Sequence, residues 1–237
     1  VAFVHNLIGG SFTYVGNGVD NGGKKFPSER YTPYHVPHST DIAGFMTILH
    51  GDMRFYNNLF VQREADPFYI RYAKEYLEEY QTDKMHFGCG TFPYEAYPLD
   101  TEYFSKFTAE SCIDYGGNDR YYDHLPVYYG GNCYLNGAKP CTKETDAVTD
   151  EENHVELCLK QKNGKYILYT NIYDVIGEKR GAMITSDTLG EAFEPEQRFE
   201  NPDGTDIRFD HDYFGNERGR MPMAGPFEHI ASEYEVY

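Results

Sequence analysis

The chain has 237 residues, enough for a sizeable core in one large domain or two small ones without a disulfide framework. Its 38 acidic and 21 basic residues give a net charge of −17, which argues against nucleic acid and anionic membrane as partners, because both would repel it. No apolar run approaches the roughly 18 residues of a membrane span. The 5 cysteines would leave one unpaired if they formed disulfides, and they match no zinc spacing, so a reducing compartment and hence a cytoplasmic location is the simpler expectation.

Three segments share one local form, in which an aromatic or β-branched residue is followed by Asn and an apolar pair. They are "FVHNLI" (3–8), "FYNNLFV" (55–61) and "YGGNCYL" (129–135). The asparagines at 6, 58 and 132 are 52 and 74 residues apart, about two and three times the roughly 25 residues of one coil in a parallel β-helix. Asparagine and glycine suit sharp corners, and stacked asparagines can bond from rung to rung. The alternative is an antiparallel meander with the same turn residues.

The stretch "ERYTPYHVPHSTD" (29–41) combines two prolines with charged and aromatic residues. Pro33 and Pro37 hold the chain extended, so that polar side chains are presented at low entropy cost. We therefore take Arg30, Tyr34, His35 and His38 as candidate binding residues for sugar hydroxyls. The alternative is that His35 and His38 bond nearby carbonyls in a structural loop.

Residues 42–61 show what one coil would look like, with the short runs "FMTIL", "MRFY" and "LFV" separated by "HGD" and "NN". Asp52 stands at the corner before "MRFY", and Arg54 would point the same way two residues later. A carboxylate kept ionised by an arginine suits a nucleophile or an electrostatic stabiliser. The alternative for Asp52 is a turn aspartate in an ion pair.

The residue pattern changes between residues 63 and 124, from strand-like runs to helical periodicity. In "FYIRYAKEYLEEY" (68–80), Tyr72, Tyr76 and Tyr80 recur every four residues, which predicts an amphipathic helix. Asp100 stands where the N-cap of a second helix belongs. We expect this span to be a helical, loop-rich excursion that packs on the β-structure.

A hairpin is predicted at residues 155–171, "VELCLKQKNGKYILYTN". Asn163 and Gly164 lie between two alternating runs and predict a two-residue type I′ turn. The register then pairs Lys162 with Lys165, Leu159 with Leu168 and Leu157 with Thr170.

Near the C-terminal end, "IRFDHDYFG" (207–215) alternates acidic with aromatic or apolar residues, as an exposed rung would. The aspartates at 203, 206, 210 and 212 lack the order of an EF-hand, so we interpret them as solvated turn acids and predict no metal site. Nucleophile-elbow, Walker and Rossmann patterns are absent from the sequence, which leaves carboxylates as the candidate catalytic groups. Asp41 and Glu64 would stack if they lie one coil apart.

The sequence thus predicts an all-β dominated fold, a partial parallel β-helix with a helical and loop excursion and a hairpin; the resemblance described next implies that the β-helix is right-handed. We expect β-helix coils in residues 1–62, the excursion in 63–124, and C-terminal coils with the hairpin in 125–237.

The segments "VAFVHNLIGGSF", "RYTPYHVPHSTDIAGFMTILHGDMRFYNNLFV", "LPVYYGGNCYLNGAKP" and "PDGTDIRFDHDYFGNERG" resemble the C-terminal part of right-handed β-helix glycoside hydrolases. The resemblance is to the β-xylosidases of glycoside hydrolase family 120. It implies a retaining exo-enzyme that removes xylose from the non-reducing ends of xylo-oligosaccharides, with an aspartate nucleophile, a glutamate acid/base and no cofactor.

On this interpretation Asp52 is the catalytic residue, and Arg30, Tyr34, His35, His38 and Arg54 bind the substrate. Family members are longer, with earlier coils and a β-sandwich, so an N-terminal part of the β-helix or a second copy is an expected partner beside the sugar. Two other classes stay open. One is a polysaccharide lyase on the same fold, and the other is a non-catalytic β-helix module for carbohydrate binding or assembly.

Overall fold

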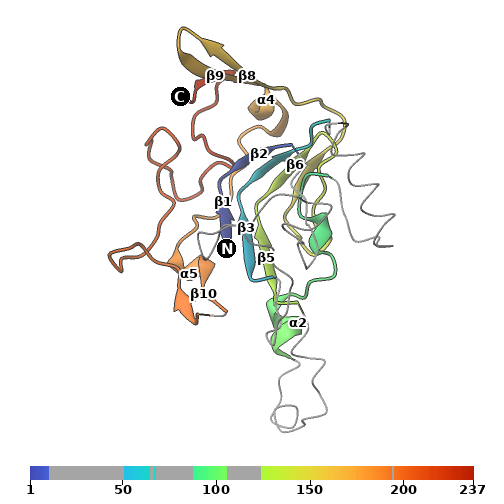
Figure 1. The fold of residues 1–237 in the computed structure, drawn as a ribbon, viewed down its shortest axis with the longest axis vertical. Helices are drawn as coiled ribbons and strands as arrows, with labels where there is room; N and C mark the ends of the chain where they lie inside the picture. Colours follow the sequence, from blue (N-terminus) through green and yellow to red (C-terminus); the bar gives the residue numbers. More distant parts are fainter. Residues whose placement is uncertain (11–50, 65–66, 68–87, 106–123, 194) are drawn as a thin grey trace, which may run out of the picture.

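The structure is a computed structural model that describes residues 1–10, 51–64, 67, 88–105, 124–193 and 195–237 (Figure 1). Strands dominate these residues, and the helices among them are short. No helix in the described ranges is long and apolar enough to cross a membrane. The predicted tyrosine-rich helix at 68–80 and the proline-rich stretch at 29–41 lie outside the described residues.

Two parallel sheets form the centre of the fold, and the chain passes from one to the other three times (Figure 1). The first sheet has the order β1 (Ala2–Val4), β3 (Met53–Tyr56), β5 (Val127–Gly130). The second has the order β2 (Leu7–Gly9), β4 (Leu59–Val61), β6 (Cys133–Leu135), β7 (Val148–Asp150). The three segments recognised in the sequence are therefore three stacked rungs, each a strand, a two-residue corner and a second strand.

Each corner turns through one residue with a left-handed backbone. His5, Asn57 and Gly131 have φ values of 55°, 54° and 67°. A Cβ at position 131 would collide with the side chain of Asn57, which explains the glycine in the third corner. Asn and Gly adopt this conformation readily, and His does so more often than most residues.

The second residue of each corner is an asparagine, and these side chains form the ladder predicted from the sequence. The Oδ1 of Asn58 accepts from the backbone N of Asn6 at 2.9 Å and from its Nδ2 at 3.1 Å. The Oδ1 of Asn132 accepts from the N and the Nδ2 of Asn58, both at 2.9 Å. Asn58 and Asn132 are fully buried, so the amides satisfy backbone groups that water cannot reach.

The number of coils predicted from the spacing of the asparagines, in contrast, was wrong. Gaps of 52 and 74 residues suggested two and three coils, yet Asn6 bonds directly to Asn58 and Asn58 to Asn132. Each gap therefore separates two rungs that are direct neighbours at these corners.

Both faces of the second sheet are covered by apolar side chains, because successive side chains of a strand point to opposite faces. In β4, Leu59 and Val61 face a cluster completed by the C-terminal segment, with Tyr173, Met223, Phe227 and Tyr234. Phe60 faces the opposite way, toward the aromatic cluster between the sheets, and stacks on Tyr134 with ring centroids 5.0 Å apart.

The predicted hairpin is confirmed in type and register. Strands β8 (Leu157–Lys162) and β9 (Lys165–Thr170) pair antiparallel, with Lys162 opposite Lys165, Leu159 opposite Leu168 and Leu157 opposite Thr170. Asn163 and Gly164 have φ values of 53° and 81°, as a type I′ turn requires. A third strand, β12 (Glu233–Glu235), pairs antiparallel with β9.

Among the described residues before β5 lie the short helical elements η1 (Phe92–Tyr94) and α2 (Asp100–Phe104). The N-cap of α2 is Leu99, so Asp100 is the first helical residue and the predicted cap was wrong by one position. Glu102 supplies the capping interaction, since its Oε2 accepts from the N of Leu99 at 2.7 Å.

The C-terminal segment contains the remaining short elements. They are α4 (Ile172–Ile176), α5 (Ser186–Leu189), β10 (Glu191–Ala192) and β11 (Gln197–Arg198). Residues 207–215 form no strand, only single bridges such as Thr185 to Arg208, so the rung predicted there was wrong. The alternation of acidic with aromatic or apolar residues in this stretch belongs to separate turns and not to a strand.

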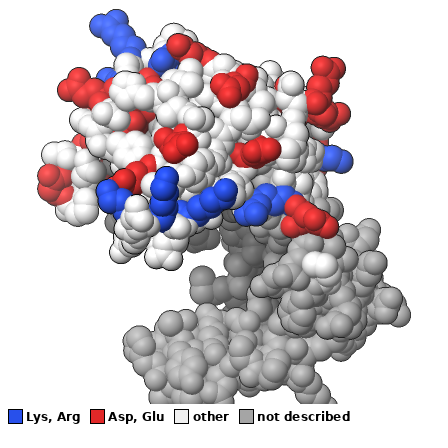
Figure 2. Space-filling model, turned by 90° about the horizontal axis from the view of Figure 1, so that it is seen from above, with Lys and Arg blue, Asp and Glu red and all other residues white. Residues whose placement is uncertain are grey.

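The aspartates of this segment are turn or ion-pair acids. Asp203 accepts from Thr205, Asp206 pairs with Arg198, and Asp210 bonds His211. We expected all four aspartates to be solvated, but Asp212 is buried. Figure 2 shows acidic side chains dispersed over the face seen from above, with a row of Lys and Arg along one border. On this face the net negative charge is not gathered into one patch.

Candidate functional site

Asp52 lies at the entrance to β3 in a left-handed conformation, with φ 54°. The preceding Gly51 has φ 126°, and a Cβ there would collide with the carbonyl of Leu125. The N of Asp52 donates to the O of Pro126 at 2.7 Å, which anchors the corner to the next rung. The "HGD" sequence thus ends in a tight corner with the Asp52 side chain held at its edge.

Both carboxylate oxygens of Asp52 have protein partners. Oδ1 accepts from Nη1 of Arg54 at 2.7 Å, and Oδ2 accepts from the backbone N of Phe193 at 3.1 Å. The side chain is 18% exposed. The predicted proximity of Asp52 and Arg54 is therefore present, in the form of a turn aspartate in an ion pair, which was the alternative considered from the sequence.

Arg54 is almost fully buried, and each of its three side-chain nitrogens donates a hydrogen bond. Nε bonds the O of Leu189 and Nη2 the O of Glu191, both at 2.6 Å, while Nη1 bonds Asp52. The rings of Tyr128 and Phe199 lie on the guanidinium, each with its centroid 4.7 Å away. Arg54 thereby fastens α5 and β10 to the second rung, and its donors are engaged within the protein.

The other predicted binding residues, Arg30, Tyr34, His35 and His38, lie outside the described residues, as does Asp41. Their relation to Asp52 remains a prediction.

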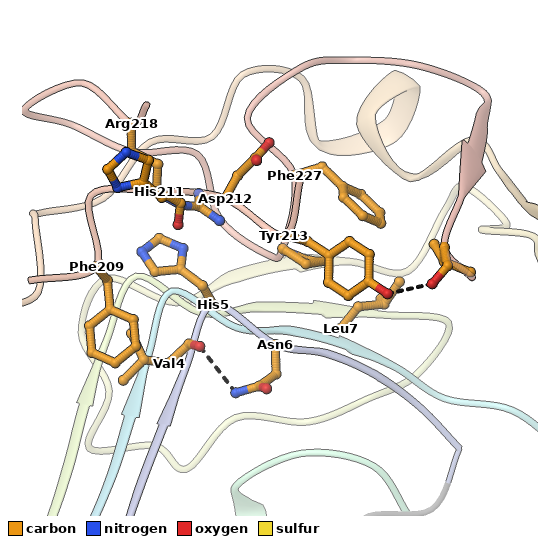
Figure 3. A pocket seen from close by; sticks show the side chains of 12 residues that line it. Val4, His5, Asn6, Leu7, Phe209, His211, Asp212, Tyr213, Arg218 and Phe227 are labelled. Carbon is orange, nitrogen blue, oxygen red and sulfur yellow. Dashed lines mark hydrogen bonds between the residues drawn. The ribbon is translucent and has the colours of Figure 1, made fainter. Parts of the chain in front are cut away.

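A pocket of about 540 Å³ lies between the first corner and the C-terminal segment (Figure 3). The corner contributes residues 4–7, and the facing wall is largely aromatic, with Phe209, Tyr213 and Phe227. His5 projects into this region, where its ring lies 6.4 Å from that of Phe209. In the sequence this corner shows only as a repeat, because the facing wall comes from more than 200 residues further along the chain.

The charged groups around the pocket are neutralised by internal contacts. Buried Arg218 donates to the carbonyls of Met223 at 3.1 Å and Gly225 at 2.9 Å, and contacts Glu228 at 3.2 Å. Burial lowers the pKa of Arg218. Burial alone would raise the pKa of Asp212, but hydrogen bonds from Asn216 and from backbone N–H groups bring it below its usual value.

His5 is neutral in this environment. Burial, followed by the positive charge of Arg218, lowers the pKa of His5 to about 3. Its Nε2 lies 3.3 Å from Nδ2 of Asn57, which can only donate, so the imidazole accepts there.

Glu144 is a buried carboxylate at the far end of the asparagine ladder. Its Oε1 accepts from the N and Nδ2 of Asn132, at 3.2 and 2.8 Å, and its Oε2 accepts from the hydroxyl of Tyr134 at 2.6 Å. Burial raises the pKa of Glu144, although these hydrogen bonds oppose the shift. A small pocket of about 170 Å³ beside it is lined by the acids Asp100 and Asp146 and by several tyrosines.

No protein-family model matches the chain, and no curated protein matches it.

A solved structure does match, that of XylC in complex with xylose, with a TM-score of 0.69 and 23% sequence identity. The match covers 100% of this chain and 32% of the XylC chain, so this chain spans about a third of its neighbour's length. At this identity the comparison shows a shared fold, compatible with the strand-dominated, parallel arrangement described above.

Proposed function

We propose that this chain is a xylose-related glycoside hydrolase, or the C-terminal part of one, and that its stacked rungs are coils of a right-handed parallel β-helix. The supporting observation is the similarity of the whole chain to XylC, which was solved with xylose bound. The three-rung stack with an internal asparagine ladder agrees with it. A neutral sugar also suits a chain of net charge −17, which would repel anionic ligands.

The proposed reaction is retaining hydrolysis that releases xylose from the non-reducing end of xylo-oligosaccharides. A carboxylate attacks the anomeric carbon while a carboxylic acid protonates the leaving oxygen, and water then hydrolyses the glycosyl intermediate. Asp52 is the proposed nucleophile, with Arg54 and the N–H of Phe193 fixing its orientation.

Arg30, Tyr34, His35 and His38 are proposed to bind sugar hydroxyls beside Asp52. The partner that we propose for the acid/base role is a carboxylic acid outside the described residues, either in this chain or in an N-terminal part of the β-helix. The chemistry requires no metal or organic cofactor.

The experiment is hydrolysis of a nitrophenyl β-xyloside by the chain, alone and together with the N-terminal part that the family resemblance implies. Asp52→Asn should lower turnover on the order of 10³-fold or more if Asp52 is the nucleophile. The control is Asp203→Asn, an exposed turn aspartate that accepts from Thr205. Full activity of Asp52→Asn would remove Asp52 from the mechanism.

A second candidate, a non-catalytic carbohydrate-binding module, is favoured by one observation. Both carboxylate oxygens of Asp52 and all three side-chain nitrogens of Arg54 are already bonded within the protein. This function predicts binding of xylo-oligosaccharides without any turnover, and calorimetry beside the hydrolysis assay would distinguish the two.

A further inference from the structure

Strand β8 is an open edge of the sheet that it forms with β9 and β12. Among the described residues no strand pairs with its outer side, and the hairpin that contains it extends from the stack of rungs (Figure 1). The opposite edge strand, β12, has only 3 residues, and the carbonyl of Val236 directly after it accepts a hydrogen bond from the hydroxyl of Tyr213. β8 has 6 residues and is exposed from Cys158 to Lys162, so it is the longer and more open edge.

The register of the hairpin determines which backbone groups of β8 lie on this edge. In an antiparallel pair, opposite residues alternate between pairs that exchange two hydrogen bonds and pairs that exchange none. In β9 the N–H groups of Tyr166 and Thr170 both bond carbonyls on the β12 side, so the residues opposite them in β8 have no hydrogen bond to β9. The N–H and C=O groups that point outward are those of Leu157, Leu159 and Gln161.

The side chains of β8 alternate between an apolar and a polar face. Leu157 and Leu159 lie on one face, and Leu159 is 58% exposed. Cys158 and Lys160 lie on the other face, and Glu156, exposed directly before the strand, continues the alternation on that side. The ion pairs of the described residues include neither Glu156 nor Lys160. The edge thus offers apolar groups on one side and two unpaired opposite charges on the other.

We propose that a second copy of this chain pairs with the first through this edge, antiparallel and centred on Cys158, so that the two three-stranded sheets become one. In this register Leu157 lies opposite the second copy's Leu159, and Glu156 lies opposite the second copy's Lys160. Each pair occurs twice, because the interface has two-fold symmetry. Apolar side chains therefore meet apolar ones, each charge meets its opposite, and Cys158 faces its own copy.

Other registers of the same edge are less complementary. A pairing centred on Leu159 would place Leu157 opposite Gln161, and a pairing centred on Lys160 would place two lysines opposite each other. Lysine on an edge strand commonly prevents pairing with other chains. Here Lys160 excludes the register in which it meets itself and favours the register in which it meets Glu156.

Pairing of β8 with β12 of a second copy is the main alternative, because β12 carries Glu233 and Glu235. Glu235 is already bonded to Lys165 within the sheet, at 2.5 Å. Such a contact joins two different surfaces, so it leads to open chains of molecules or to rings and not to a closed dimer. The self-complementary charges of β8 favour the closed dimer.

Space for a partner strand is present where β8 meets the rungs. A pocket of about 340 Å³ borders Leu157 and Cys158 there, and residues 61–64 form another part of its lining. The second copy's Leu159, opposite Leu157, lies next to this pocket. A pair of strands of this length is small beside the roughly 1,200 Å² of a stable interface, so we expect a weak and reversible dimer. It forms whether or not the chain hydrolyses xylosides.

The first test is disulfide crosslinking of the full chain by diamide, whose azo group takes up the two thiol hydrogens as the S–S bond forms. Opposite residues of a non-hydrogen-bonded pair have Cα atoms about 4.5 Å apart, within the range that a disulfide spans. Among the described cysteines only Cys158 is exposed, and Cys112 is replaced by Ser in every variant. The matched control, Cys158→Ser with Lys162→Cys, moves the thiol along the same face and keeps Glu156 and Lys160.

The thiols of the control lie about 27 Å apart in the proposed register. The chain with Cys158 should therefore form covalent dimers about tenfold faster than the control or more, since only thiols within disulfide distance react without strand movement. Equal rates would show random collision and would overturn the proposal, as would the absence of covalent dimer from both.

The second test measures the dimer without a thiol at its centre, by sedimentation equilibrium of Cys158→Ser. Lys160→Glu should raise the dissociation constant about fivefold or more, because it places like charges opposite each other. Adding Glu156→Lys exchanges the two charges and should restore the parent value. Lys162→Glu, the same change of charge elsewhere on the strand, is the control and should have little effect.

Two results of this second test would contradict the proposal. One is a chain that stays monomeric at every concentration. The other is an open assembly whose mass keeps rising with concentration, which would indicate pairing of β8 with β12. Urea unfolding of each variant checks that these exposed substitutions leave the fold intact.

Discussion

His5 is a buried histidine whose environment makes it neutral. Its pKa of about 3 results from burial and from the nearby charge of Arg218. An unfolded histidine takes up its proton near pH 6.5. Between these two values the unfolded chain binds more protons than the folded chain, so the free energy of unfolding falls as the solution is acidified through this window.

The prediction compares His5→Asn with the parent chain, because asparagine tolerates the same left-handed backbone. Between pH 7 and pH 5 the parent should lose about 2 kcal/mol more of its free energy of unfolding than the variant, measured by urea denaturation. Gln161→Asn, at an exposed position of β8 without a titratable group, is the control and should follow the parent. An identical pH dependence for His5→Asn would contradict this account of His5.

The contribution of Glu144 to the free energy of unfolding depends on pH in the opposite direction. Its pKa is raised by burial, so the folded chain holds this proton at a higher pH than the unfolded chain, and its contribution to stability is lost as pH rises through the folded pKa. The carboxylate persists because it satisfies three donors that no water reaches, two from Asn132 and one from Tyr134.

We predict that Glu144→Gln stays within about 1 kcal/mol of the parent at pH 7, since glutamine keeps an acceptor oxygen and removes the buried charge. Glu144→Leu should cost about 3 kcal/mol or more, because it leaves the three donors without an acceptor. Urea midpoints measure both values. Equal stability of the two variants would show that the hydrogen bonds of Glu144 are not what holds it there.

At the level of elements, the asparagine ladder predicts that a substitution costs more stability at a buried corner than at the exposed end. Asn58→Leu removes both the acceptor for Asn6 and the donor to Asn132 inside a fully buried corner, and should cost about 2–4 kcal/mol. Asn6→Leu at the exposed end should cost about 1 kcal/mol or less. Chemical denaturation of both variants measures the difference, and equal costs would contradict a ladder that opens at Asn6.

Local patterns predicted elements well when the whole signal lay in neighbouring residues. Asn163 and Gly164 set the hairpin register because the turn geometry fixes which residues face each other. The asparagine ladder was predictable because each rung repeats the same corner. The acid alternation in 207–215 misled, since turns stabilised by Asp212 produce the same pattern as an exposed strand.

Contacts between residues that lie far apart in the chain could not be predicted from the sequence. A gap of 52 residues does not distinguish an extra coil from an insertion between neighbouring rungs. The spacing of Asp52 and Arg54 predicted their contact, but their partners Phe193, Leu189 and Glu191 lie more than 130 residues away. Whether a carboxylate forms a structural ion pair or takes part in chemistry depends on such partners, and the local spacing of residues does not reveal them.

At the scale of the molecule, the described residues combine a stack of parallel rungs with a C-terminal segment that crosses its corners and a hairpin that extends from it (Figure 1). The comparison with XylC covers the whole of this chain, and the proposal of a xylose-related hydrolase rests on it. The fold similarity is compatible with the strand-dominated, parallel arrangement that the sequence predicts.

The most direct measurement is the release of xylose from xylotriose, followed by chromatography, for the chain alone and together with an N-terminal part of the β-helix. The account predicts xylose and xylobiose as first products in at least one of the two mixtures, as expected for an exo-enzyme acting at the non-reducing end. Intact xylotriose in both mixtures would contradict the proposed hydrolase function.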